Sequence, residues 1–159
     1  MLELFFKSYT VSAGMQEASQ YKIMNRLALE AYQNGEKGLE VDVSFLGKRS
    51  APNVRGSIKN IDRENFTPSA LVIGILRGMC NELYELYDGF SEKKTRIVAS
   101  GGAVRNNEVL KKLIGERFGA SVFVHATREE AATGAALFSA FVAGAIKYDN
   151  GFSEYISYN

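Results

Sequence analysis

The stretch RIVASGGAVRNNEVLKKLIGERFGASVFVH, residues 96–125, decides the predicted fold. Its two ends, residues 96–100 and 121–125, are short apolar runs, and such runs are typical of buried strands. Between them, residues 107–119 place valine, leucine and isoleucine at helical spacing. The order strand, turn, helix, strand predicts a βαβ unit with parallel strands and a right-handed crossover.

The turn inside this stretch is the first candidate for a ligand site. Gly101 and Gly102 follow the first strand and carry no Cβ, so a flat ligand can lie against their backbone. Open α/β sheets bind ligands at the carboxyl ends of their strands, which is where this turn lies. We expect Asn106 to cap the following helix and to face the ligand with its amide. The alternative, in which the glycines serve a tight turn alone, stays open.

A further helix is expected directly after the second strand. Thr127, with Glu130 three residues later, predicts a capping box and a helix that runs to about Ile146. The first turns, residues 131–136, are mostly alanine and glycine, so this helix can closely approach either a neighbouring element or a ligand. We interpret Glu129 and Glu130 as helix caps that favour the positive dipole end, and not as a catalytic acid–base pair.

The first half of the chain predicts more helix than strand. Asn34 and Gly35 form a helix stop signal, and Thr67 before Pro68 forms a helix start signal. Expected elements are a short helix over residues 2–9, a helix over 21–32, strands over 39–46 and 57–61, and a long helix over 68–88.

Composition excludes several classes of function. Lys and Arg total 19 and Asp and Glu total 18, so the net charge of +1 gives no large field to attract nucleic acid or anionic lipid, and only a local basic patch stays open. Cys80 and His125 are the single cysteine and histidine, which excludes an internal disulfide and leaves little material for a zinc cluster or a Ser-His triad. We therefore expect no catalytic residue of these kinds and no metal ligand in this chain, and no nucleic-acid partner.

The length of 159 residues and the 46% apolar content predict one folded unit over residues 1–159. Residues 131–146 form the longest apolar stretch, which is shorter than the roughly 20 residues that a membrane span requires. The amino terminus lacks a signal-peptide pattern, so we expect a cytoplasmic protein without a membrane partner.

Two other patterns fit known phosphate motifs poorly. The GGAVRN turn lacks the dinucleotide-binding spacing, and a P-loop ending at GKRS would need glycine where the chain has Asp42. Lys48, Arg49 and Arg55 form a local basic loop that could meet a phosphate, although a solvated loop is the commoner explanation.

Residues 99–141, ASGGAVRNNEVLKKLIGERFGASVFVHATREEAATGAALFSAF, resemble the adenosine-motif region of the FGGY carbohydrate kinases. That family includes glycerol kinase, xylulokinase, gluconokinase and sedoheptulokinase. Residues 44–79 are similar to the family's strand–loop segment before a long helix. LELFFKSY, residues 2–9, and FSEYISY, residues 152–158, look most like the sedoheptulokinase branch.

The resemblance implies an α/β fold: a partial actin-like, ribonuclease-H-like ATPase domain that is helix-rich with a small mixed sheet. It implies transfer of the γ-phosphoryl group of ATP, with Mg²⁺, to a sugar hydroxyl. At the matching positions, Gly101 and Gly102 would lie against the adenine and ribose, and Asn106 would hydrogen-bond the adenine edge. Ala103 and the helix that begins at Thr127 would close the pocket.

The resemblance also implies what lies elsewhere in such kinases: the catalytic aspartate, the phosphate loops, most sugar contacts and most of the metal site. We therefore expect this chain to be the carboxyl-terminal part of the second kinase domain, without sugar kinase activity alone. The alternative is a non-catalytic assembly module, in which an uncovered sheet edge and residues 2–9 join another subunit, as in a homo-oligomer.

Overall fold

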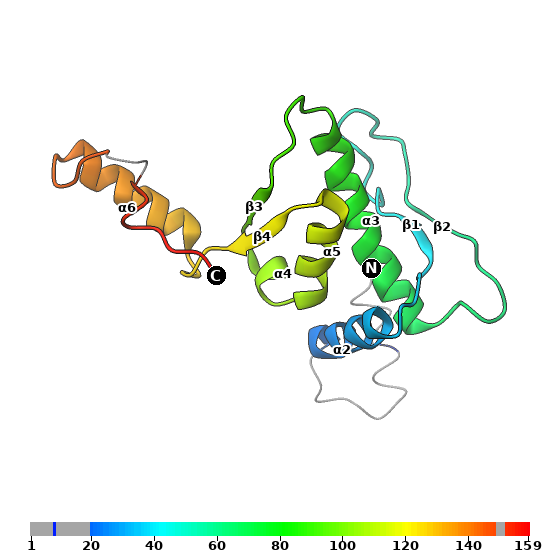
Figure 1. Ribbon diagram of the computed structural model, residues 1–159. Helices are drawn as coiled ribbons and strands as arrows, with labels where there is room; N and C mark the ends of the chain where they lie inside the picture. Colours follow the sequence, from blue (N-terminus) through cyan, green and yellow to red (C-terminus); the bar gives the residue numbers. More distant parts are fainter. Residues whose placement is uncertain (1–7, 9–19, 149–151) are drawn as a thin grey trace. The chain divides into compact units, whose positions relative to one another are not determined.

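The computed structural model describes residues 8, 20–148 and 152–159 (Figure 1). The chain divides into two compact units, Met1–Ser91 and Glu92–Asn159. The short helix expected over residues 2–9 falls outside the described residues except for Ser8. One domain over the whole chain stays a prediction.

Helices α2 and α3 belong to the first unit. Helix α2 spans Gln20–Gln33, and Gly35, with a φ of 67°, lets the chain turn after it, so that the Glu36 N–H donates to the Ala31 carbonyl at 2.9 Å. Helix α3 spans Pro68–Asp88, and the Thr67 hydroxyl accepts from an N–H of its first turn. Both signals that the sequence offers are confirmed.

Two short strands lie beside these helices. Strand β1, Glu40–Asp42, pairs antiparallel with β2, Ser57–Lys59, and Val41 faces Ile58. β1 is shorter than the expected strand over residues 39–46, because the Asp42 carboxylate accepts from the Ser44 N–H at 2.9 Å and bends the chain. The alternation of apolar and polar side chains correctly predicts a strand here, but the strand is shorter than predicted.

The core of this unit lies between β1 and α3. Its buried members are Leu39, Val41, Ala70, Leu71 and Ile75. Gly74 and Gly78 allow the strand to approach the helix, because a Cβ at either position would lie 2.4 or 2.3 Å from a carbonyl oxygen of the strand segment.

The second unit contains the predicted βαβ arrangement. Strand β3, Arg96–Ala99, pairs in parallel with β4, Ser121–Val124. The short helix α4, Gly102–Arg105, and helix α5, Glu108–Phe118, connect the two strands (Figure 1). Among the described residues the strands form two separate pairs, and each pair follows from its connection: a helical crossover gives the parallel pair and a loop gives the antiparallel one.

Helix α6 spans Glu130–Val142 and ends before the expected Ile146, because Gly144 takes a φ of 73° that a helix cannot continue. None of its described residues is buried. The C-terminal residues pair with the end of β4: the Val124 N–H donates to the Asn159 carbonyl at 2.9 Å, and the Asn159 N–H donates back at 2.8 Å. Part of the sheet edge that we expected to be open is thus covered.

Candidate functional site

The two glycines after β3 form an open surface, which we call the glycine shelf (Gly101 and Gly102). Gly101 has a φ of 98°, a conformation that favours glycine. Among the described residues, a Cβ at Gly101 would meet no heavy atom within 4 Å, and one at Gly102 would meet the Asn106 amide nitrogen at 3.8 Å. Both glycines and Ala103 are exposed. The shelf is therefore accessible to a ligand and is not filled by the described side chains.

Asn106 lies beside the shelf but does not cap the following helix as expected. It ends α4, and its N–H donates to the Gly102 carbonyl at 3.0 Å. The cap of α5 is Asn107, whose side-chain oxygen accepts from the Leu110 N–H at 2.9 Å. The helical turn of α4 extends to Arg105, so the extended backbone that an N-cap requires occurs one residue later than predicted.

Arg105, which the sequence analysis did not identify, connects this turn to the end of β4. Its guanidinium donates to the carbonyls of His125 at 2.8 Å and Thr127 at 2.7 Å, and it pairs with the Glu130 carboxylate. The two charged side chains are 19% and 25% exposed. Arg105 and Glu130 are 25 positions apart, so no local sequence pattern could predict their contact. The sequence signal for a role of Arg105 is a large cationic side chain in a turn of small residues.

Glu130 is held by the turn and not by a capping box. The pKa of the Glu130 carboxyl is lowered, chiefly by a hydrogen bond from its own backbone N–H. Burial opposes this effect, and the hydrogen bond and charge of Arg105 and the N–H of Gly101 add to the lowering. The predicted capping box is wrong: the Thr127 hydroxyl contacts the His125 Nδ1 at 2.6 Å and the Thr133 hydroxyl at 3.2 Å. Glu129 precedes α6 without a side-chain cap bond.

His125 and Cys80 occupy structural positions. His125 is buried, its Nδ1 accepts from the Thr127 N–H at 3.0 Å, and its ring meets that of Tyr158 edge-on. Cys80 is buried in α3. Within the described ranges no group of three or more His, Cys, Asp or Glu side chains could hold a metal ion.

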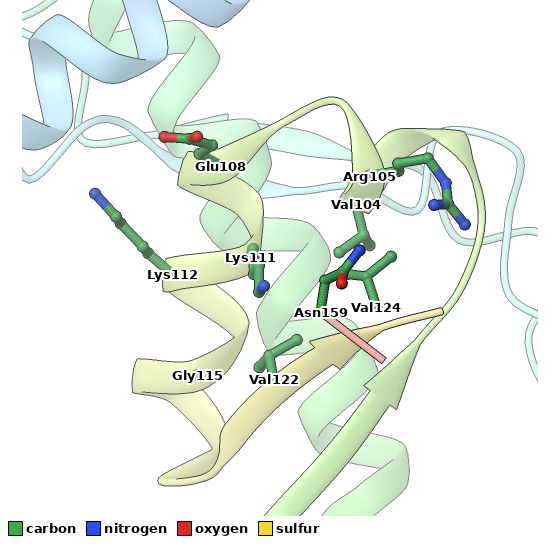
Figure 2. Close-up of a pocket in the computed structure, with 9 residues that line it drawn as sticks. All are labelled: Val104, Arg105, Glu108, Lys111, Lys112, Gly115, Val122, Val124 and Asn159. Atoms are coloured by element: carbon green, nitrogen blue, oxygen red, sulfur yellow. The ribbon is translucent and has the colours of Figure 1, made fainter. Parts of the chain in front are cut away.

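A separate pocket of about 570 Å³ lies between α5 and β4. Figure 2 shows Glu108, Lys111 and Lys112 on α5 and Val122 on β4 around it, while the Arg105 side chain extends away from the lysines. Its lining combines one acidic residue, Glu108, with three basic residues, Arg105, Lys111 and Lys112, and does not include the glycine shelf. It is therefore distinct from the site that the sequence predicts.

The basic loop is bonded to its own unit. Lys48 forms an ion pair with Glu85 at 3.2 Å, and the hydrogen bond and charge of Glu85 raise the pKa of Lys48. Arg55 donates to the carbonyls of Pro52 and Val54. Arg49 is exposed. Two of the three cations thus have partners within the protein.

Comparison with protein families gives a match over most of the chain. A family model described as the C-terminal domain of the FGGY family of carbohydrate kinases matches residues 5–143. No curated protein is similar enough to count as a match. In the part of the chain that the structure describes, no helix has both the length and the apolar character to span a membrane.

Solved structures of sugar kinases are similar over nearly the whole chain. The ligand-bound xylulose kinase of Lactobacillus acidophilus gives a TM-score of 0.72 at 14% identity over 98% of this chain and 32% of its own. Plasmodium falciparum glycerol kinase with ADP gives a TM-score of 0.69 at 16% identity, over 88% of this chain and 28% of its own. Gluconate kinase from Lactobacillus acidophilus gives a TM-score of 0.68 at 17% identity, over 88% of this chain and 28% of its own.

The chain spans less than one third of the length of these kinases. The similarity confirms the expected fold class, a helix-rich α/β structure like the C-terminal portion of kinases with an actin-like ATPase fold.

Proposed function

Since the chain belongs to the FGGY family of carbohydrate kinases, whose C-terminal domain it matches, we propose that it is the adenine-nucleotide-binding part of an ATP-dependent sugar kinase. The parent reaction would transfer the γ-phosphoryl group of ATP to a sugar hydroxyl. The proposal combines the family match with the site at the end of β3, where a parallel strand pair ends in two exposed glycines.

The single observation that carries the proposal is the open glycine shelf. A Cβ added at Gly102 would lie 3.8 Å from its nearest described neighbour, the Asn106 amide nitrogen, so the packing of the described residues does not require glycine there. A flat ring that lies against the backbone does require it, because any side chain would occupy the space of the ring. In our proposal Gly101 and Gly102 lie against the adenine and ribose, and Ala103 borders the pocket.

Asn106 supplies recognition in this proposal. An amide side chain offers both a donor and an acceptor, which matches the amino group and ring nitrogens on the edge of adenine. Asn106 ends the same helical turn that begins at Gly102, so its side-chain amide lies next to the shelf, with its nitrogen 3.8 Å from the Cβ position of Gly102.

The direct test is ADP binding measured by calorimetry on the wild-type chain, Gly102→Val and Asn106→Ala. Gly102 is not in a positive-φ conformation, so valine there fills the shelf without the backbone strain expected at Gly101. We expect Gly102→Val to abolish measurable binding and Asn106→Ala to weaken it about tenfold, the usual cost of one lost polar contact to a ligand.

Matched controls come from the first unit. Gly89→Val places a Cβ 3.7 Å from its nearest neighbour, and Asn53→Ala removes an exposed amide. Both should bind ADP as the wild type does. Absence of ADP binding by the wild type, or binding that neither site variant changes, would refute the proposed function.

The reaction of the parent kinase would use Mg²⁺. Among the described residues no group of three or more His, Cys, Asp or Glu side chains could hold a metal ion. From the family resemblance, we propose that other parts of a complete kinase hold most of the metal site and the catalytic base, and we assign no step of the transfer to this chain.

For the sugar acceptor we propose sedoheptulose first, since residues 2–9 and 152–158 resemble that branch. We also propose that the parent enzyme acts in the cytoplasm. Comparing turnover of a full-length enzyme on sedoheptulose, xylulose and glycerol would test the acceptor.

A second function, assembly, is favoured by one observation. Helix α6 buries none of its described residues, and Phe138, Phe141 and Val142 are 63%, 42% and 68% exposed. Exposed apolar surface of this kind marks an interaction site when it is contiguous. A sharp monomer in analytical ultracentrifugation, without binding of an apolar-surface dye, would exclude the assembly module.

A further inference from the structure

Arg105 ties three segments around the glycine shelf together. Its backbone N–H donates to the Gly101 carbonyl at 3.2 Å, so the residue belongs to the same helical turn as the shelf. Its side chain leaves that turn and donates to the carbonyls of His125 and Thr127, which follow β4, and to the carboxylate of Glu130 at the start of α6.

The guanidinium group suits this task. It presents five N–H donors in a rigid plane, so a single side chain can hold three acceptors in fixed directions, whereas lysine offers one point charge on a flexible stem. Bonds between guanidinium and carboxylate are charge-assisted and are stronger than neutral ones. Because both side chains are mostly sheltered, with 19% and 25% exposure, solvent and salt screen the pair less than an open surface pair.

Glu130 completes the connection from the side of α6. Its carboxylate pairs with Arg105, while hydrogen bonds from its own N–H and from the N–H of Gly101 contribute to the lowered pKa of the carboxyl. The shelf is therefore connected to the start of α6 through Arg105, whose backbone belongs to the turn of the shelf and whose side chain reaches Glu130.

The shelf needs such a connection. Glycine has the largest backbone freedom of any residue, so two consecutive glycines do not by themselves hold a fixed surface. A ligand that orders a mobile loop loses affinity by the entropy of that ordering, while a preformed surface avoids the loss. Among the described residues, the shelf itself contributes no side chain that could restrain it.

We infer that Arg105 and Glu130 are positioning residues for nucleotide binding, which hold the glycine shelf and the first turn of α6 in one arrangement so that the purine meets a preformed surface. The inference rests on the proposed function. Neither side chain has to touch the nucleotide, so their effect passes through Gly101, Gly102 and Asn106.

The test compares Arg105→Gln and Glu130→Gln with the neighbouring controls Arg128→Gln and Glu129→Gln. Arg128 and Glu129 are exposed, and each control makes the same change of charge close to the site. Calorimetry would measure the dissociation constants for ADP and for GDP on all five proteins. We expect the two site variants to bind ADP about tenfold more weakly and to lose part of the preference for ADP over GDP.

The ratio of the dissociation constant for GDP to that for ADP separates a positioning role from an effect on folding. A variant that is partly unfolded binds both nucleotides more weakly by the same factor, so its ratio stays at the wild-type value. A displaced shelf changes the fit of the adenine edge to Asn106 and lowers the ratio.

The outcomes distinguish the two proposals. If the wild type binds ADP and the site variants equal their controls in affinity and in ratio, the positioning role is wrong and the proposed function stands. If the site variants lose affinity at an unchanged ratio, the pair is merely structural and the inference also fails. If the wild type does not bind ADP, the proposed function fails and the inference fails with it.

Discussion

Gly101 and Gly102 are neighbours with different backbone requirements, and this difference makes the site testable. Gly101 needs its positive φ of 98°, so its substitution would mix backbone strain with loss of a ligand surface. Gly102 has no such requirement, and a Cβ there would make only an ordinary van der Waals contact with the Asn106 amide nitrogen at 3.8 Å. A side chain at Gly102 therefore fills the ligand surface without the backbone strain that one at Gly101 would add.

At the level of single residues, the Arg105–Glu130 pair also predicts that the free energy of unfolding depends on pH. The pKa of Glu130 lies below its ordinary value of 4.5 in the folded chain, so the ionised carboxylate favours folding. This contribution is fully present above pH 4.5 and is lost as the pH falls from there through the lower folded-state pKa. The stability difference between wild type and Glu130→Gln should therefore shrink on acidification.

Urea denaturation at a series of pH values would measure this difference, with Glu129→Gln as the control. The control should give no comparable decrease in the same window. A difference between wild type and Glu130→Gln that grows on acidification would contradict the assignment of the lowered pKa to the folded state.

Among the elements, α3 and β1 show how glycine permits close packing. A Cβ at Gly78 would lie 2.3 Å from the Val41 carbonyl oxygen, which is part of the backbone and cannot rotate away. Gly134 in α6 is also within a helix, but a Cβ there would meet no described heavy atom within 4 Å. The same substitution should thus have opposite effects at the two positions.

We expect Gly78→Ala to lower the free energy of unfolding by about 1–3 kcal/mol, the usual cost of overpacking. Gly134→Ala should stabilise its helix by up to about 1 kcal/mol, because alanine has the higher helix propensity. Native-state hydrogen exchange of amides in α3 and in α6 would measure each effect. Equal stabilisation by both variants would contradict the close approach of β1 to α3.

Elements with strong local signals were predictable from the sequence. Residues 96–125 combine apolar strand runs with a helical period, and Thr67–Pro68 is a helix start that involves neighbouring residues alone. The start of α6 was less predictable, since the Glu130 carboxylate can either complete a capping box or pair with a distant cation. Its carboxylate bonds Arg105, a residue far away in sequence, and so is not available for the capping box.

The position of the cap of α5 was missed for a related reason. Asn106 and Asn107 have the same side chain, and the backbone conformation decides which of them caps. The extra turn of α4 shifts the extended residue from Asn106 to Asn107, and the local sequence carries no signal for that turn.

For the whole molecule, the central question is whether a chain spanning less than one third of the length of related kinases can act alone. Phosphoryl transfer needs a base, phosphate-binding groups and a metal in one arrangement. We therefore predict that the 159-residue chain shows no sugar-dependent ADP release with sedoheptulose, xylulose or glycerol. Turnover clearly above a no-sugar control in a coupled assay would contradict this prediction.

The most direct test of the nucleotide site is an NMR titration of the isotope-labelled wild-type chain with ADP. We predict saturable shifts of the backbone amides of Gly101 and Gly102 and of the side-chain amide of Asn106, with the amides of the Lys48–Arg55 loop unchanged. Shifts confined to residues away from the end of β3, or no shifts at saturating ADP, would contradict the account.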